Sequence, residues 1–168
     1  MAAPLASFQG NAIYVDAVLV VGLIDPLSPW HVSSHAFFQQ ATDPQRQYHL
    51  RTSTLTMDEV VFVLMQELLL RPPYNVTRSR SQYLAAHPQV VQALMAVIDP
   101  SLDPLPNLID IEPVFPDDIT VMRQEMLASG TLPRDAIHVA VMRRLGLSAI
   151  ATDDEGFERC AGITVYKP

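Results

Sequence analysis

The stretch Ile13-Tyr14-Val15-Asp16 is the part of the sequence from which the fold can be read. Three apolar residues followed by an acid are typical of a short strand buried on both faces. Residues 18–24 continue the apolar run and predict a first helix, which ends near Asp25-Pro26. A buried strand followed at once by a helix is the opening unit of an α/β protein.

The same alternation of strands and helices continues along the chain. Apolar periodicity predicts further helices at residues 32–41, 50–70, 81–98 with an interruption at His87-Pro88, 116–129, and 131–145. Further strands are expected at residues 107–111, 148–152 and 163–166, and a proline-rich loop at residues 99–106. We therefore expect an α/β sandwich around a mainly parallel sheet, in which ligands bind at the carboxyl ends of the strands.

Local signals mark where several helices begin and end. In the helix expected at residues 50–70, Thr56 followed three residues later by Glu59 is the pattern of a capping box, which makes Thr56 the expected N-cap. Gly130 and Gly146 stand where helices at 116–129 and 131–145 would end.

Length and composition indicate a single domain over residues 1–168 in the cytoplasm. A chain of 168 residues that is 49% hydrophobic can bury a core, and no stretch reaches the roughly 20 apolar residues of a membrane helix. No secretory leader is recognisable, and the single cysteine, Cys160, suits a reducing compartment. A net charge of −7 argues against a protein that coats nucleic acids, but not against an enzyme that grips RNA locally.

Four acids stand at the ends of the expected elements. Asp16 and Asp154, the latter next to Asp153, follow strands, whereas Glu59 and Asp135 lie in the first turns of helices. Each has a structural alternative: a turn for the acids after strands, a cap for Glu59, and a favourable position near the helix dipole for Asp135.

Taken together, the four acids predict a metal site. Two carboxylates about 4 Å apart repel by about 4 kcal/mol at an effective dielectric constant of about 20. Such a cluster is stable when it takes up protons or holds a cation, and ligands that are all oxygen favour Mg²⁺ or Mn²⁺. Because Mg²⁺ usually shares its site with a phosphate, metal-assisted hydrolysis of a phosphodiester is the reaction that we expect.

Four segments resemble the motifs of PIN-domain nucleases, in the same order and over nearly the whole chain. The first opens the chain's buried strand, and the third and fourth are the most specific. The segments are Ile13-Tyr14-Val15-Asp16-Ala17, residues 52–60 (TSTLTMDEV), residues 132–140 (LPRDAIHVA) and residues 149–157 (AIATDDEGF).

The resemblance implies a PIN-like three-layer sandwich and a Mg²⁺- or Mn²⁺-dependent endoribonuclease. The subgroup that it resembles is the VapC-type toxins, which act on structured RNA such as tRNA or rRNA, usually dimerise, and are neutralised by a small antitoxin. Position by position, the family's catalytic and metal-binding acids correspond to Asp16, Glu59, Asp135 and Asp154. Asp153 is the ambiguous neighbour of Asp154, and Thr152 would orient the loop or a water.

Two positions depart from the family pattern. Val18 stands where the family usually has Asn or Ser, and Gly156 where a further Asp is common. Because Val18 has no hydrogen-bonding side chain, a catalytically weakened PIN domain that binds RNA or protein is the alternative function. An aspartyl-phosphate phosphatase is disfavoured, since it would need a second Asp at position 18.

Weaker candidates surround the acids. Arg134 could contact an RNA phosphate or form a surface salt bridge, and His138, one turn after Asp135, could touch substrate. For His31 and His35, solvated or capping roles are expected rather than metal binding. A set of apolar side chains could line a groove for an antitoxin helix, although core packing is the alternative for most of them: Phe37, Phe38, Val61, Leu64 and Leu68.

Overall fold

The computed structural model describes residues 2–43 and 48–168. Within these residues it contains one sheet of six parallel strands, in the order β1-β6-β5-β2-β3-β4. The strands are β1 (Ala3–Pro4), β2 (Ala12–Val15), β3 (His49–Ser53), β4 (Asp110–Glu112), β5 (Ala149–Ala151) and β6 (Thr164–Lys167). The predicted parallel sheet is confirmed, so the carboxyl ends of all strands share one edge.

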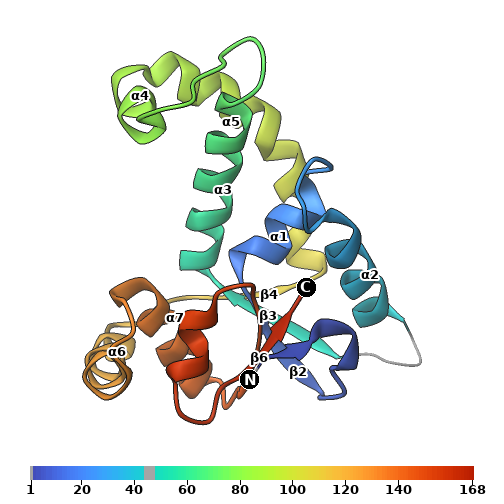
Figure 1. Cartoon of the computed structure of the whole chain (residues 1–168), viewed down its shortest axis with the longest axis vertical. Coiled ribbons are helices and arrows are strands. Elements are labelled where there is room, and N and C mark those ends of the chain that lie inside the picture. Colours follow the sequence, from blue (N-terminus) through green and yellow to red (C-terminus); the bar gives the residue numbers. More distant parts are fainter. Residues whose placement is uncertain (1, 44–47) are drawn as a thin grey trace.

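Helices cover both faces of this sheet. In Figure 1, α1 and α2 lie on one side of the sheet, α6 and α7 lie on the other, and α3 rises away from it towards α4 and α5. The bounds are α1 (Ala17–Ile24), α2 (His31–Thr42), α3 (Thr54–Leu69), α4 (Arg80–Ala86), α5 (Pro88–Leu102), α6 (Pro116–Ser129) and α7 (Pro133–Arg144). Short 3₁₀ turns occur at η1 (Leu5–Ser7), η2 (Leu105–Asn107) and η3 (Glu155–Arg159).

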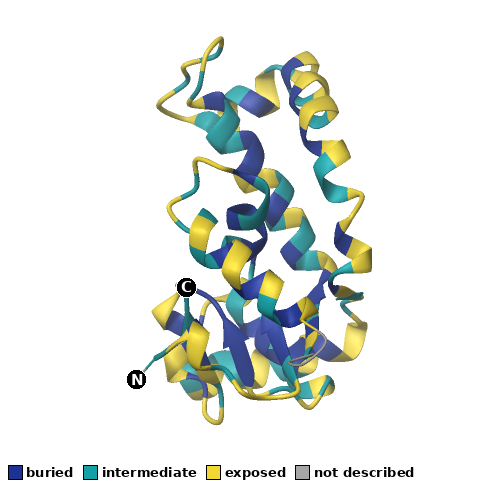
Figure 2. Ribbon diagram, turned by 90° about the vertical axis from the view of Figure 1, so that its right-hand side faces the viewer, coloured by how far each residue is buried: buried dark blue, intermediate teal, exposed yellow. Residues whose placement is uncertain are grey.

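Strand β2 shows why the molecule has three layers. Successive side chains of a strand point to opposite faces, and the last three of the four residues of β2 are fully buried. Ile13 and Val15 belong to the core cluster formed with α1, α2, α3 and α5, whereas Tyr14 belongs to the cluster formed with α7. Figure 2 shows buried residues through the sheet and exposed residues on the outer faces of the helices. The predicted three-layer sandwich is confirmed.

The helix expected at residues 50–70 is wrong in its first turn. Residues His49–Ser53 form strand β3, which pairs with β2 and β4, and the helix α3 begins at Thr54. The N-cap of α3 is Ser53, whose Oγ accepts a hydrogen bond from the Thr56 N–H at 3.3 Å. The predicted capping box of Thr56 and Glu59 is therefore wrong, and Glu59 is released from the role of a cap.

Other boundaries also differ from the prediction, among them the strand expected at residues 107–111, which begins only at Asp110 as β4. Helix α5 continues to Leu102 with Pro100 inside its last turn, where a loop was expected, because buried Ile98 anchors this end of the helix in the core. Strand β1 was also not expected, and it pairs with β6. In contrast, α6 has the predicted bounds, and Gly130 and Gly146 both take the left-handed conformation, with φ of 68°.

None of the helices in the described residues is both long and apolar enough to cross a membrane.

Candidate active site

The site lies where three neighbouring strands, β5, β2 and β3, end at the same edge of the sheet. Asp16 directly follows β2, and Asp154 lies in the loop after β5. Glu59 lies in α3, which starts directly after β3, and Asp135 lies in the first turn of α7 on the opposite face of the sheet. The four acids predicted from the sequence are thus brought to one place by four separate segments.

Asp16 is held in a fixed orientation. Its Oδ1 accepts a hydrogen bond from the Ala17 N–H at 2.8 Å, which caps α1. Its Oδ2 accepts the hydroxyl of buried Thr152 at 2.5 Å. Thr152 Oγ1 also accepts the Asp154 N–H at 3.0 Å, so this threonine joins the loop after β5 to the acid after β2. The position of Thr152 agrees with the orienting role expected for it.

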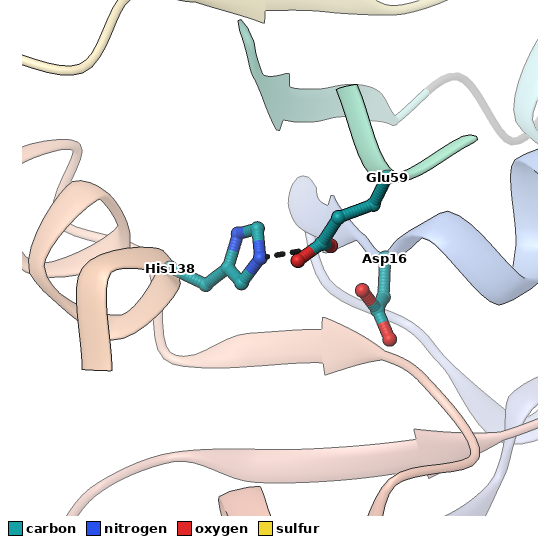
Figure 3. Close-up of side chains that lie close together, drawn as sticks. All are labelled: Asp16, Glu59 and His138. Atoms are coloured by element: carbon teal, nitrogen blue, oxygen red, sulfur yellow. Dashed lines mark hydrogen bonds and ion pairs between the residues drawn. The ribbon is translucent and has the colours of Figure 1, made fainter. Parts of the chain in front are cut away.

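Glu59 lies between two nitrogen donors from α7. Its Oε2 is 3.2 Å from Nε2 of His138, and its Oε1 is 3.4 Å from Nε of Arg134. In Figure 3 the carboxylate of Glu59 lies between the His138 ring and Asp16. One ligand atom each of Asp16, Glu59 and His138 lies within 4.8 Å of the others. His138, which the sequence suggested as a contact to substrate, therefore lies beside two of the four acids.

The environment of Asp16 and Asp135 disfavours the charged forms of these two acids. Burial raises the pKa of the Asp16 carboxyl, and the hydroxyl of Thr152 opposes this effect. Burial also raises the pKa of Asp135, and the nearby negative charge of Asp154 raises it further. Desolvation and like charges thus act together, and a bound cation would relieve both effects.

Asp154 and Asp153 differ in their surroundings. Asp154 caps η3, because its Oδ1 accepts the Gly156 N–H at 2.6 Å, and its side chain lines the pocket between the acids. Asp153 is exposed and is not among the residues that line this pocket. The pocket has a volume of about 240 Å³, and its lining consists of Asp16, Ala17, Glu59, Phe62, Val63, Arg134, Asp135, His138, Asp154 and Phe157.

An all-oxygen set of four carboxylates suits a hard divalent cation, and the pocket has room for such an ion together with water. Asp16, Glu59, Asp135 and Asp154 fit the ligands that Mg²⁺ and Mn²⁺ prefer. The raised pKa of two of the four is what a site that is stabilised by a cation would show. The residues present therefore fit the metal that the sequence predicted.

Tyr14 is a site residue that the sequence did not reveal. It lies in the middle of β2, is fully buried, and its hydroxyl lies 2.9 Å from His138 Nδ1 and 3.2 Å from Thr56 Oγ1. Burial raises the pKa of this phenol, so it keeps its proton. The one signal available was its position in a strand buried on both faces, where a tyrosine hydroxyl needs a partner.

The other basic candidates mostly serve the fold. Arg134 is half-exposed and forms an ion pair with Asp58 at 2.8 Å, so the expected surface salt bridge is present. His31 and His35 hydrogen-bond to the carbonyls of Gly22 and Leu23 near the end of α1, which is the capping role expected for them.

The five apolar side chains considered for an antitoxin groove lie in the core or pack against it. Phe37, Phe38 and Leu64 are buried in the core. Core packing, the alternative, is therefore correct for these three.

A second pocket, of about 320 Å³, lies next to the acidic pocket. It is lined by Val18 and Trp30, among others, and it shares Ala17 and Val63 with the acidic pocket.

Comparisons with known proteins agree on the fold. Residues 13–163 match the model of the PIN domain family. No curated protein sequence matches the chain. Several solved structures are similar at low sequence identity, and two of them serve as examples. VapC20 of Mycobacterium tuberculosis, a sarcin-ricin loop cleaving toxin, has a TM-score of 0.53 at 18% identity, over 87% of this chain and 93% of its own. VapBC2 of Rickettsia felis, bound to a DNA fragment from its promoter, has a TM-score of 0.56 at 10% identity, over 94% of this chain and 98% of its own.

Proposed function

This chain belongs to the PIN domain family, and from that premise we propose that it is a metal-dependent endoribonuclease. The observation that carries the proposal is the convergence of Asp16, Glu59, Asp135 and Asp154 on one pocket. These acids come from four segments of the chain, and the local structure of those segments does not by itself explain why all four acids meet. Their proposed role is to hold Mg²⁺ or Mn²⁺.

The side chains divide the work of hydrolysis. When bound, the metal would lower the pKa of a water molecule and neutralise charge that develops on the phosphate. Asp16 would help to hold the metal, and its carboxylate is already oriented because the Ala17 N–H and the Thr152 hydroxyl each donate to one of its oxygens. Arg134, at the rim, is placed to pair with a phosphate oxygen of RNA in exchange for its surface ion pair.

We further propose that the chain is the toxin of a VapBC-type pair and acts as a single domain. The support is the likeness of its fold to VapC20 and VapBC2, of which the first cleaves the sarcin-ricin loop. A structured RNA is accordingly the substrate class to test first, with tRNA and rRNA as candidates. An antitoxin partner, a homodimer and a cytoplasmic location remain predictions.

The proposal is tested by RNA cleavage with the purified chain in Mg²⁺ or Mn²⁺, with and without EDTA. We expect EDTA to abolish cleavage, and Asp16→Asn and Asp135→Asn each to lower its rate more than about 100-fold. This is the upper limit for residues that only support metal ligands, so a ligand should cost more. Asp110→Asn is the matched control, because Asp110 is exposed at the start of β4 and pairs with Arg51. Cleavage that survives EDTA and Asp16→Asn would contradict the proposal.

The alternative is a PIN domain that binds RNA or protein without cleaving. Val18 favours it, since this valine lines the neighbouring apolar pocket and offers no hydrogen bond near Asp16. Measured Mn²⁺ binding without cleavage of varied RNAs would support the alternative. A gain of cleavage in Val18→Asn would indicate instead an enzyme that the valine weakens.

A further inference from the structure

A line of buried polar side chains runs behind Glu59. Ser53 Oγ lies 3.3 Å from Thr56 Oγ1, which lies 3.2 Å from the Tyr14 hydroxyl. The Tyr14 hydroxyl lies 2.9 Å from His138 Nδ1, and His138 Nε2 lies 3.2 Å from Glu59 Oε2. The first four residues are each 2% exposed or less, and of the five only His138 and Glu59 line the pocket.

Counting the protons of these groups shows in which direction each hydrogen bond of the line is donated. An ionised Glu59 can only accept, so His138 Nε2 must carry a proton. A neutral imidazole then has a bare Nδ1, which accepts the single proton of the Tyr14 hydroxyl. The Tyr14 oxygen can in turn accept from Thr56, and Thr56 from Ser53. Each hydroxyl donates once, and every donor is directed towards the carboxylate.

His138 is not available as a metal ligand in this arrangement. Both of its nitrogens have partners, Tyr14 at Nδ1 and Glu59 at Nε2, and its side chain is 2% exposed. Its ring is also packed between Tyr14 and Phe157, at centroid distances of 5.8 Å and 6.4 Å. The ring can therefore orient Glu59, but its packing hinders it from turning away from Glu59 to bind a metal.

We infer that Tyr14 and His138 are positioning residues: the Tyr14 hydroxyl selects the Nε2–H tautomer of His138, and that N–H holds Glu59 in the orientation that binds the metal. The inference rests on the proposed metal-dependent function for its purpose, although the tautomer is a property of the metal-free chain. Hydrogen bonds that orient a ligand commonly change metal affinity by about 10- to 100-fold.

The tautomer is measured first, by long-range ¹H–¹⁵N correlation of the histidine ring in the metal-free protein at pH 8. We expect His138 to show a protonated Nε2 and a bare Nδ1, and Tyr14→Phe to shift the resonances towards a mixture of tautomers. Tyr166→Phe is the matched control, because Tyr166 lies in the same sheet and packs on Phe8. A wild-type ring with its proton on Nδ1 would overturn the inference.

Mn²⁺ affinity, measured by titration calorimetry, then tests the effect on the site. We expect His138→Leu to weaken Mn²⁺ binding about 10-fold or more, and His138→Gln to weaken it less, because the amide can still donate to Glu59. Tyr14→Phe should weaken binding in the wild-type background and add nothing in the His138→Leu background, since the two residues act in series. Tyr166→Phe should leave Mn²⁺ affinity unchanged.

The outcomes separate the inference from the proposed function. Tight Mn²⁺ binding that is unaffected by His138→Leu would overturn the positioning role and leave the nuclease proposal in place. Additive effects of Tyr14→Phe and His138→Leu would show two independent structural roles and would also overturn it. Wild-type protein that binds no Mn²⁺ and cleaves no RNA would contradict the proposed function itself, even where the tautomer is the expected one.

Discussion

Asp153 and Asp154 are adjacent acids of which the fold directs one into the pocket. The backbone N–H of Asp154 donates to Thr152 Oγ1, and its Oδ1 accepts the Gly156 N–H, whereas Asp153 does not line the pocket. A carboxylate that is oriented by the Gly156 N–H on a fixed backbone can serve a metal with little further ordering. A side chain that must first be ordered loses conformational entropy on binding.

This difference predicts unequal effects of neutralising the two residues. Asp154→Asn keeps a side-chain oxygen that can accept from the Gly156 N–H but removes a ligand charge, so we expect Mn²⁺ affinity and the cleavage rate to fall at least about 10-fold. Asp153→Asn is the neighbouring control and should change either quantity less than about two-fold, as isolated exposed charges do. Both are measured by calorimetry and RNA cleavage. A larger loss in Asp153→Asn would reverse the assignment.

Helix α1, which Asp16 caps, packs closely against helix α2 at Gly22. A Cβ added at Gly22 would lie 2.3 Å from Ser34 Oγ and 3.1 Å from the Trp30 carbonyl oxygen. Ser34 is fully buried, and its Oγ has no hydrogen-bond partner among the described residues. The glycine therefore allows α2 to approach the helix that Asp16 caps.

We expect Gly22→Ala to destabilise the protein by about 1–3 kcal/mol, the usual cost of overpacking a core. The free energy of unfolding is measured by urea denaturation in EDTA. Adding Ser34→Gly should recover part of the loss because it removes the atoms nearest to the new methyl group. Ser34→Gly alone is the control for the effect of glycine on α2. An unchanged or raised stability in Gly22→Ala would show that the helices can separate without cost.

At the scale of the whole molecule, the site lowers stability, because folding buries the carboxylates of Asp16 and Asp135 and disfavours their charged forms. Asp16 and Asp135 both have a raised pKa, chiefly from burial. Between the unfolded pKa of Asp, about 3.9, and these raised values, the folded chain binds more protons than the unfolded one. The contribution of these acids to the free energy of unfolding therefore falls as pH rises through that window, and stays low above it.

We accordingly expect metal-free Asp135→Asn to be more stable than the wild type at pH 8, with the difference vanishing near pH 4. Excess Mn²⁺ should reverse the order at pH 8, because a ligand at about 100 times its Kd stabilises the folded state by about 2.7 kcal/mol and the variant loses much of that affinity. Thermal denaturation with EDTA or Mn²⁺ at both pH values checks this. A metal-free wild type that is the more stable protein at pH 8 would show that the acids do not strain the fold.

Local patterns were sufficient for much of the architecture. The bounds of α6, the glycines after α6 and α7, and the buried triplet of β2 all follow from residues close in sequence, because helix hydrogen bonds and caps join residues three to five positions apart. The four acids could be identified because they stand at the ends of such elements. Their catalytic roles still rest on the family resemblance and on the experiments above.

Tertiary structure decided what depends on contacts between distant segments. Residues 49–53 form a strand because β2 and β4 supply hydrogen bonds on both sides. The sequence of residues 49–53 does not by itself indicate partners that lie so far along the chain. The same reason removed Glu59 from its predicted cap and placed it against His138, 79 residues away. Tyr14 and His138 meet across 124 residues, so the line of hydrogen bonds behind the candidate metal site is a product of the sheet and of helix α7 closing over it.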